Sequence, residues 1–142
     1  MDELTIPPTL TALTTYLLSR TGKDARGRLA AELSARGLRL WHMAVLAALA
    51  DFGPHSQRDL AERLAIDPSD IVKVLDDLAG AGHVTRTRDP VDRRRLRVCL
   101  TPDGRAALSS LIVEAEAIQA GLLAPLTPAE RATLHELLRR IF

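Results

Sequence analysis

Apolar residues recur every three or four positions along most of the chain, which is the spacing of amphipathic helices. The clearest stretch runs from about residue 38 to Phe52, and Gly53-Pro54 ends it. An earlier stretch predicts a helix that ends near Gly22, with its apolar residues at Leu10, Leu13 and Leu17. The charged segment 23–37 fits either a loop or a poorly patterned helix.

Two capping signals divide the centre of the chain into a pair of short helices. Ser56, followed three residues later by Asp59, resembles a capping box. Asp67-Pro68 then supplies an N-cap residue and a proline at the first helical position. The inner face of this second helix is predicted at Ile71, Val74, Leu75 and Leu78. Two short helices separated by about three residues are typical of a helix-turn-helix.

Beyond Gly82 the apolar period changes from that of a helix to that of a strand. Residues 83–88 predict one strand, 89–92 carry turn residues, and 95–100 alternate strictly. The alternation predicts one face with Leu96, Val98 and Leu100 and another with Arg95, Arg97 and Cys99. A hairpin directly after a helix-turn-helix predicts a winged helix.

Two further amphipathic helices follow the hairpin. Thr101-Pro102 begins the first, and Thr127-Pro128-Ala129-Glu130 begins the second with a capping box. The apolar positions of the first are Leu108, Leu111, Ile112, Ala115, Ile118 and Leu122. Those of the second are Leu134, Leu137, Leu138 and Ile141. The predicted fold class is therefore mainly α with a small β-hairpin wing.

Composition changes this picture in only a few respects. The chain has 142 residues, of which 46% are hydrophobic, enough for the core of one domain. A single cysteine, Cys99, excludes an internal disulfide and a cysteine-based zinc site. The N-terminus shows no secretory pattern, and the longest apolar run, residues 43–50, is too short to span a bilayer. The sequence predicts a cytoplasmic protein with no membrane partner.

Charge is concentrated rather than abundant. The whole chain has a net charge of +1, yet six arginines and two aspartates lie between residues 86 and 97, a local charge of +4. Duplex DNA carries about one negative charge per 1.7 Å of axis, and the arginine fork suits phosphate. The cluster therefore indicates DNA binding; the alternative is a solvated hairpin whose charge discourages edge-to-edge aggregation.

The sequence contains no catalytic signature. Its four histidines show no metal-binding spacing, and no glycine-rich phosphate loop or serine elbow is present. We expect no enzyme activity, no cofactor and no metal. The rival to a DNA-binding regulator is a winged helix that serves only protein interaction or dimerisation.

The chain resembles the multiple-antibiotic-resistance-regulator (MarR) family of transcription regulators. The resemblance rests on "DLAERLAIDPSDIVKVLDDLAGAGHVTR", residues 59–86, and on "DPVDRRRLRVCLTPDG", residues 89–104. It implies a homodimer interlocked by its first and last two helices, with each winged helix on half of a palindromic operator. It also implies release from DNA by a small, often phenolic or anionic, ligand. The expected divisions are an N-terminal dimerisation segment (1–37), a winged helix-turn-helix (38–101) and C-terminal dimerisation helices (102–142).

Charge, exposure and the resemblance together predict the DNA-contacting residues. They are Ser56, Gln57, Arg58, Ser69, Asp70, Val72, Lys73, Arg86, Arg88, Arg93, Arg94 and Arg95. The resemblance makes Asp92 and Arg94 the wing-tip pair, in which the carboxylate orients the guanidinium or caps the turn. Relatives often have threonine where Asp70 and Val72 stand, and arginine where Asp77 stands.

Several of these positions have a second interpretation. Asp70 either accepts a hydrogen bond from cytosine N4 or only stabilises the start of its own helix. Ser56 can serve as a cap, as a phosphate contact, or as both. Trp41 and His42 are candidates for a ligand pocket, or else core packing beside a surface histidine. Cys99, among arginines, is either a redox-sensitive thiol or a small strand residue.

Overall fold

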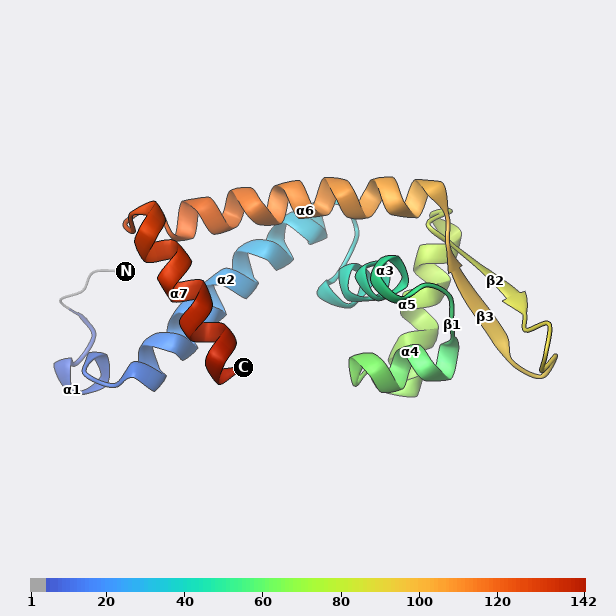
Figure 1. Ribbon diagram of the computed structural model, residues 1–142, viewed down its shortest axis with the longest axis horizontal. Helices are drawn as coiled ribbons and strands as arrows, with labels where there is room; N and C mark the ends of the chain where they lie inside the picture. Colours follow the sequence, from blue (N-terminus) through green and yellow to red (C-terminus); the bar gives the residue numbers. More distant parts are fainter. Residues whose placement is uncertain (1–4) are drawn as a thin grey trace. The chain divides into compact units, whose positions relative to one another are not determined.

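The computed structural model describes residues 5–142, and the chain divides into two compact units (Figure 1). One unit, here called the winged unit, comprises residues 32–114. The other, the terminal-helix unit, combines the chain up to residue 31 with residues 115–142. Two long helices, α2 (Thr14–Ala35) and α6 (Pro102–Leu122), contribute residues to both units.

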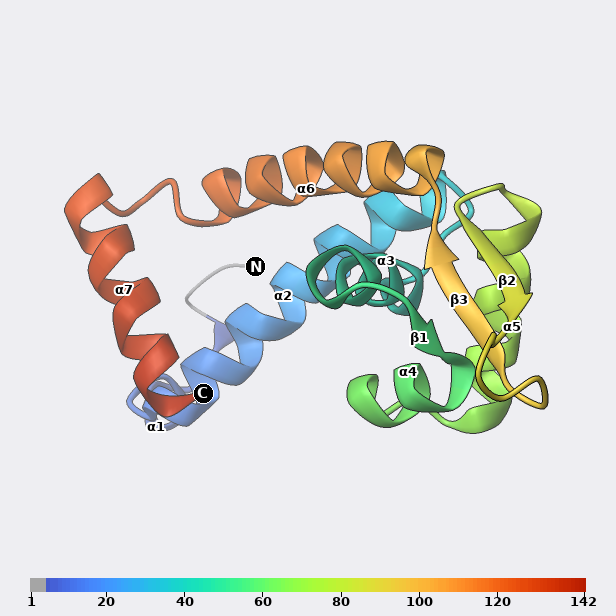
Figure 2. The same cartoon turned by 45° about the vertical axis from the view of Figure 1, so that its right-hand side comes forward.

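The winged unit contains a helix-turn-helix and a small antiparallel sheet. Its other elements are α3 (Leu40–Phe52), β1 (His55–Ser56), α4 (Gln57–Leu64), α5 (Pro68–Gly80), β2 (Val84–Arg88) and β3 (Leu96–Leu100). The strand order is β1-β3-β2, with β3 in the centre (Figure 2). The winged helix expected from the sequence is confirmed.

Local caps set the two helices of the helix-turn-helix. Ser56 Oγ accepts a hydrogen bond from the Asp59 backbone N–H at 3.1 Å, and Asp67 caps α5. Between the helices Ala65 adopts the left-handed conformation, with φ of 52°, which turns the chain sharply. Both predicted helix starts are confirmed. Each depends only on residues within one turn, so the local sequence is sufficient to predict it.

The core of the winged unit is aliphatic. The predicted inner face of α5 is confirmed, since Ile71, Val74, Leu75 and Leu78 are all buried. Helix α5 packs on α3 and α4, and the other buried leucines of the unit come from α3, α4 and α6, among them Leu46, Leu49, Leu60, Leu108 and Leu111. The start of α6 lies so close to the loop before β2 that a Cβ on Gly104 would stand 2.0 Å from the His83 carbonyl oxygen.

Two details of the hairpin differ from the prediction. Residues 55 and 56 form an additional strand, β1, which pairs with Val98 and Arg97; a two-residue strand leaves no periodic signal. Of the predicted inner face only Val98 is fully buried, whereas Leu96 is 44% exposed. The hairpin reaches beyond the helices towards its turn, so residues near the turn have no core to cover them (Figure 1).

The terminal-helix unit begins with a short α1 (Pro8–Thr11) and the long α2. The expected helix end near Gly22 is wrong, because α2 continues through the charged segment to Ala35. Polar residues there solvate the helix surface, and Arg28 pairs with Asp24 one turn away at 3.1 Å. No helix within residues 5–142 has the length and apolar character of a membrane span.

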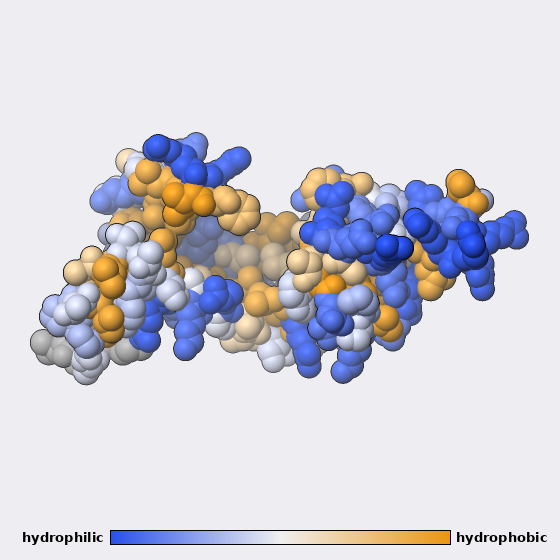
Figure 3. Space-filling model, turned by 90° about the horizontal axis from the view of Figure 1, so that it is seen from below, coloured by the Kyte–Doolittle hydropathy of each residue, from blue (hydrophilic) through white to orange (hydrophobic). Residues whose placement is uncertain are grey.

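The last helix, α7 (Pro128–Ile141), begins at the predicted capping box. Thr127 Oγ1 accepts from the Glu130 backbone N–H at 3.2 Å, and Glu130 Oε1 accepts from the Thr127 N–H at 2.9 Å. None of the residues of α7 is buried. Apolar side chains therefore lie open on the terminal-helix unit (Figure 3), including Leu137, Leu138 and Ile141.

Candidate nucleic-acid interface

The second helix of the helix-turn-helix, α5, presents a polar outer face. Between its ends, its exposed residues are Ser69, Asp70, Val72, Lys73, Asp76 and Asp77. The hydroxyl and backbone N–H of Ser69 both donate to Asp67 Oδ1, at 2.5 and 2.8 Å. These two bonds, the hydroxyl first, hold the pKa of the Asp67 carboxyl below its ordinary value. Ser69 is thereby fixed at the first turn, with its hydroxyl proton already engaged.

Two of the acidic residues on α5 have partners from elsewhere in the winged unit. Arg86 of β2 donates to Asp76 Oδ1 at 2.6 Å, which ties the wing to α5. Asp77 Oδ2 lies 3.0 Å from Nε2 of His42 in α3. Arg86 therefore neutralises one of the negative charges on this helix, and His42 hydrogen-bonds a second carboxylate.

His42 is the buried end of the second contact, at only 2% exposed. Its Nδ1 accepts the backbone N–H of Arg39 at 2.8 Å, so Nε2 carries the proton and donates to Asp77. Both ring nitrogens are thus engaged within the protein. Of the two interpretations of this pair, core packing of Trp41 beside a surface histidine is wrong, because Trp41 is 42% exposed and His42 is buried. Burial of the His42 imidazole leaves no unpaired polar atom, because both of its ring nitrogens have hydrogen-bond partners.

At the tip of the wing, Asp92 positions Arg94 through two hydrogen bonds. Asp92 Oδ1 accepts from the Arg94 backbone N–H at 3.1 Å and from its Nε at 3.2 Å. The Arg94 side chain is nevertheless 92% exposed, which leaves its terminal nitrogens open to solvent. The same carboxylate lies 3.8 Å from Nε of Arg95. Asp92 therefore both caps the turn and orients a guanidinium.

A second aspartate shapes the turn itself. Asp89 Oδ1 accepts backbone N–H groups from Val91 at 2.7 Å and Asp92 at 3.1 Å. These bonds hold the pKa of the Asp89 carboxyl below its ordinary value. Arg88 donates to the Arg93 carbonyl oxygen at 2.9 Å, across the base of the turn. The turn is thus a rigid support for its exposed arginines.

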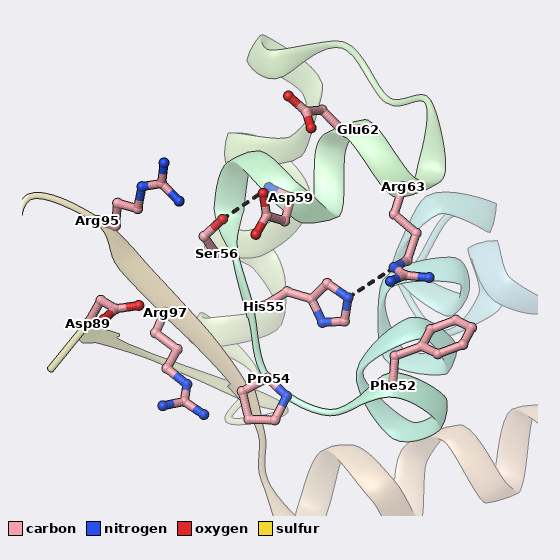
Figure 4. Close-up of a pocket in the computed structure, with 10 residues that line it drawn as sticks. All are labelled: Phe52, Pro54, His55, Ser56, Asp59, Glu62, Arg63, Asp89, Arg95 and Arg97. Carbon is pink, nitrogen blue, oxygen red and sulfur yellow. Dashed lines mark hydrogen bonds between the residues drawn. The ribbon is translucent and has the colours of Figure 1, made fainter. Parts of the chain in front are cut away.

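A groove of about 780 Å³ separates the wing from the start of α4 (Figure 4). Arg95, directly before β3, and Arg97 of β3 lie on one side, while Ser56 and Asp59 stand at the start of α4 on the other. The sequence places Arg97 in the arginine cluster of the wing but not among the predicted contacts, and its pairing with Ser56 of β1 brings it beside the helix. The two walls present arginines and a helix N-terminus to one space, an arrangement that suits a phosphate group.

Residues that line the same groove make a contact that sequence reasoning missed. His55 Nε2 accepts from Arg63 Nε at 3.0 Å, and its Nδ1 lies 2.6 Å from the Gly53 carbonyl oxygen. The guanidinium of Arg63 also stands 4.1 Å above the centre of the Phe52 ring. His55 and Phe52 lie 8 and 11 positions from Arg63, so no local pattern predicts the contacts of Arg63 with them. They fix how α3 joins α4.

The remaining candidate residues from the sequence lie on α4 and β3. Gln57 and Arg58 open α4, and Arg58 lies 3.2 Å from Glu62 in an exposed ion pair. Cys99 is half-buried on β3, opposite Thr85. Across the described residues, no three His, Cys, Asp or Glu side chains converge as they do in a metal site.

Together, the helix-turn-helix and the arginine-bearing hairpin beside it define a winged helix-turn-helix protein. The model of the MarR family matches residues 36–95, which cover the helix-turn-helix and most of the wing. The chain belongs to the MarR family. Both the resemblance read from the sequence and the predicted fold class are confirmed.

Similar proteins span different shares of the chain. The transcriptional repressor NicR of Pseudomonas putida is 35% identical over 96 residues, which are 68% of this chain and 61% of NicR. The chain spans between 52% and 61% of the length of the curated relatives that it matches.

Solved structures match nearly the whole chain, and two of them are at least 31% identical to it. A probable transcriptional regulator from Pseudomonas aeruginosa is 34% identical, with 94% of this chain and 99% of that one covered and a TM-score of 0.76. BpsR of Bordetella bronchiseptica is 31% identical, with 96% and 97% covered and a TM-score of 0.74. The BpsR structure is described as a mechanism for regulation of its DNA binding by 6-hydroxynicotinic acid.

Proposed function

We propose that the chain is a homodimeric, sequence-specific DNA-binding transcription regulator that represses genes until a small aromatic or anionic ligand releases it. The observation that carries the proposal is the exposed Arg94, held by Asp92 on a rigid turn beside a helix-turn-helix. A guanidinium fixed at the tip of a hairpin suits a narrow minor groove, where the negative potential is greatest.

The rest of the interface divides into base contacts and phosphate contacts. The first half of α5 enters the major groove, where Val72 meets a thymine methyl and Lys73 reaches guanine or phosphate. Ser69 contributes its hydroxyl oxygen as an acceptor. The start of α4, with Ser56, Gln57 and Arg58, lies against the backbone together with the arginines of the wing. Phosphate contacts supply most of the affinity and base contacts the specificity.

Dimerisation is supported by the apolar surface of the terminal-helix unit. A groove of about 730 Å³ between α2, α6 and α7 is lined mostly by leucine, isoleucine and alanine. Such a groove, beside a helix with no buried residue, indicates a surface that a partner covers. A second copy of the chain is the occupant that also supplies the second winged helix for a palindromic operator.

Ligand release is supported by the likeness to BpsR, whose DNA binding is regulated by 6-hydroxynicotinic acid. We infer that an aromatic carboxylic acid of this kind weakens DNA binding by the present chain. Trp41 is the candidate contact, since its indole is 42% exposed. His42 is a poorer candidate, because both of its ring nitrogens are engaged.

The test is a titration of the purified protein against DNA from its own upstream region at two salt concentrations. A regulator shifts that DNA specifically, and its affinity falls steeply with salt, with a slope of about −0.9 per phosphate contacted. If no duplex is bound even at low salt, the winged helix serves protein interaction alone. Addition of 6-hydroxynicotinic acid to the complex then tests release, and an unchanged shift at saturating acid would contradict the ligand part.

A further inference from the structure

The carboxylates at and on α5 are not equivalent. Asp67 accepts two hydrogen bonds from Ser69, Asp76 is paired with Arg86, and Asp77 accepts from His42. Asp70 is the exception: within residues 5–142 its carboxylate makes no hydrogen bond and no ion pair, although the side chain is exposed on the outer face. The fold thus leaves the Asp70 carboxylate, in the first turn of the helix, without a hydrogen-bond or ion-pair partner among the described residues.

The local explanation for an acidic residue at this position is weakened by the structure. Asp70 is the third residue of α5, where a carboxylate can bond back to the backbone N–H of the N-cap residue. That bond is absent, and the capping role is already filled by Asp67. What remains is an interaction with the helix dipole, which is weak at an exposed site. Stabilisation of its own helix therefore accounts for little of the placement of Asp70.

We propose that Asp70 is a specificity-determining residue that accepts a hydrogen bond from cytosine N4 in the major groove; this inference rests on the proposed function. An ionised carboxylate is an acceptor only, so it needs a donor from the base edge. The major groove offers two, cytosine N4 and adenine N6, and adenine carries the acceptor N7 beside its N6. The carboxylate is repelled by N7, so cytosine is the matching base.

The same charge excludes the other bases. Guanine presents O6 and N7, and thymine presents O4, all of which are acceptors that face a carboxylate unfavourably. A negative side chain near the phosphates costs affinity for every sequence, and only a correctly placed donor offsets that cost. Asp70 thus acts mainly by rejecting wrong sites, which is how specificity is obtained without high overall affinity.

The experiment selects binding sites from duplexes randomised across the half-site, for the wild-type chain and three variants. The wild type is expected to prefer cytosine by roughly tenfold at one position of each half-site. Asp70→Ala should lose that preference at that position alone and bind DNA of random sequence more tightly. Asp70→Asn should shift it towards adenine, because an amide can bond N6 and N7 together. Asp51→Asn, on α3, removes the same charge elsewhere and should keep the wild-type profile.

The outcomes separate this inference from the function on which it rests. If the wild type selects a palindrome but Asp70→Ala selects the same bases with the same preference, the inference is wrong and the regulator stands. A uniform rise in affinity without a change in base preference has the same meaning. If the wild type binds no duplex, the proposed function fails, and the inference fails with it. Unfolding curves for each variant confirm that the compared proteins are equally folded.

Discussion

The two units of the chain bury their apolar residues to different extents. In the winged unit, leucines and isoleucines from α3, α4, α5 and α6 are covered by one another, and the exposed surface is mainly charged. In the terminal-helix unit, α7 buries nothing, and the apolar residues of α2 and α7 remain accessible. The winged unit has its own core, whereas the terminal helices leave an apolar surface exposed, which we propose that a second copy of the chain covers.

The first prediction, with the largest expected effect, disrupts the dimer interface that we propose for the terminal-helix unit. Leu138→Glu places a charge in the apolar groove, and burial of an unpaired carboxylate costs several kcal/mol. We expect the dimer to dissociate to monomer at micromolar concentration, as measured by light scattering after gel filtration. Arg139→Gln, a polar change on the same helix, should leave the mass of the dimer unchanged. A Leu138→Glu protein that remains dimeric would contradict the assignment of this groove to the interface.

The second prediction tests the core of the winged unit. A Cβ on Gly104 would stand 2.0 Å from the His83 carbonyl oxygen, so Gly104→Ala must move α6 away from the loop before β2. We expect a loss of about 3 kcal/mol in the free energy of unfolding, the upper part of the range for overpacked sites. Gly80→Ala is the matched control: it has nothing within 4 Å and should be neutral or slightly stabilising. Urea unfolding followed by circular dichroism measures both.

The third prediction concerns the charged surface. Arg94→Ala should weaken operator binding by about 1–3 kcal/mol, because it removes the guanidinium at the tip of the wing. Asp92→Asn should have a smaller effect in the same direction, since it loosens the arginine without removing its charge. Lys23→Ala, an exposed cation of α2, is the control and should bind as the wild type does. Equal affinities for all three variants in a fluorescence titration would mean that the wing is only solvated.

The fourth prediction has the smallest effect and uses pH. The pKa of the Asp67 carboxyl lies below its ordinary value of 3.8 in the folded chain, because Ser69 donates two hydrogen bonds to it. The stabilisation is therefore complete above pH 3.8 and is lost as the pH falls through the lower folded-state pKa. Asp67→Ser keeps a capping oxygen without a titrating group. Its unfolding midpoint should vary less with pH in this acid range than that of the wild type.

The starts of three helices could be predicted from the local sequence. Ser56, Asp67 and Thr127 were all expected to cap helices, and each accepts the hydrogen bond expected of it. The prediction is wrong at Gly22. This glycine and the charged segment after it predict the end of a helix, yet α2 continues to Ala35. A glycine inside a helix costs about 1 kcal/mol relative to alanine, but arginine, lysine, glutamate, alanine and leucine, which make up most of the following segment, are good helix formers and continue the helix.

The sequence by itself determined the elements, the apolar faces of the helix-turn-helix and the concentration of charge on the wing. These features depend on residues within one or two turns of each other, and their spacing is visible along the chain. Only the tertiary structure decided which charges remain free. Asp76 and Asp77 have partners 10 and 35 positions away, and Asp70 has none among the described residues. Compensation of charge depends on distances in space, which a linear pattern does not contain.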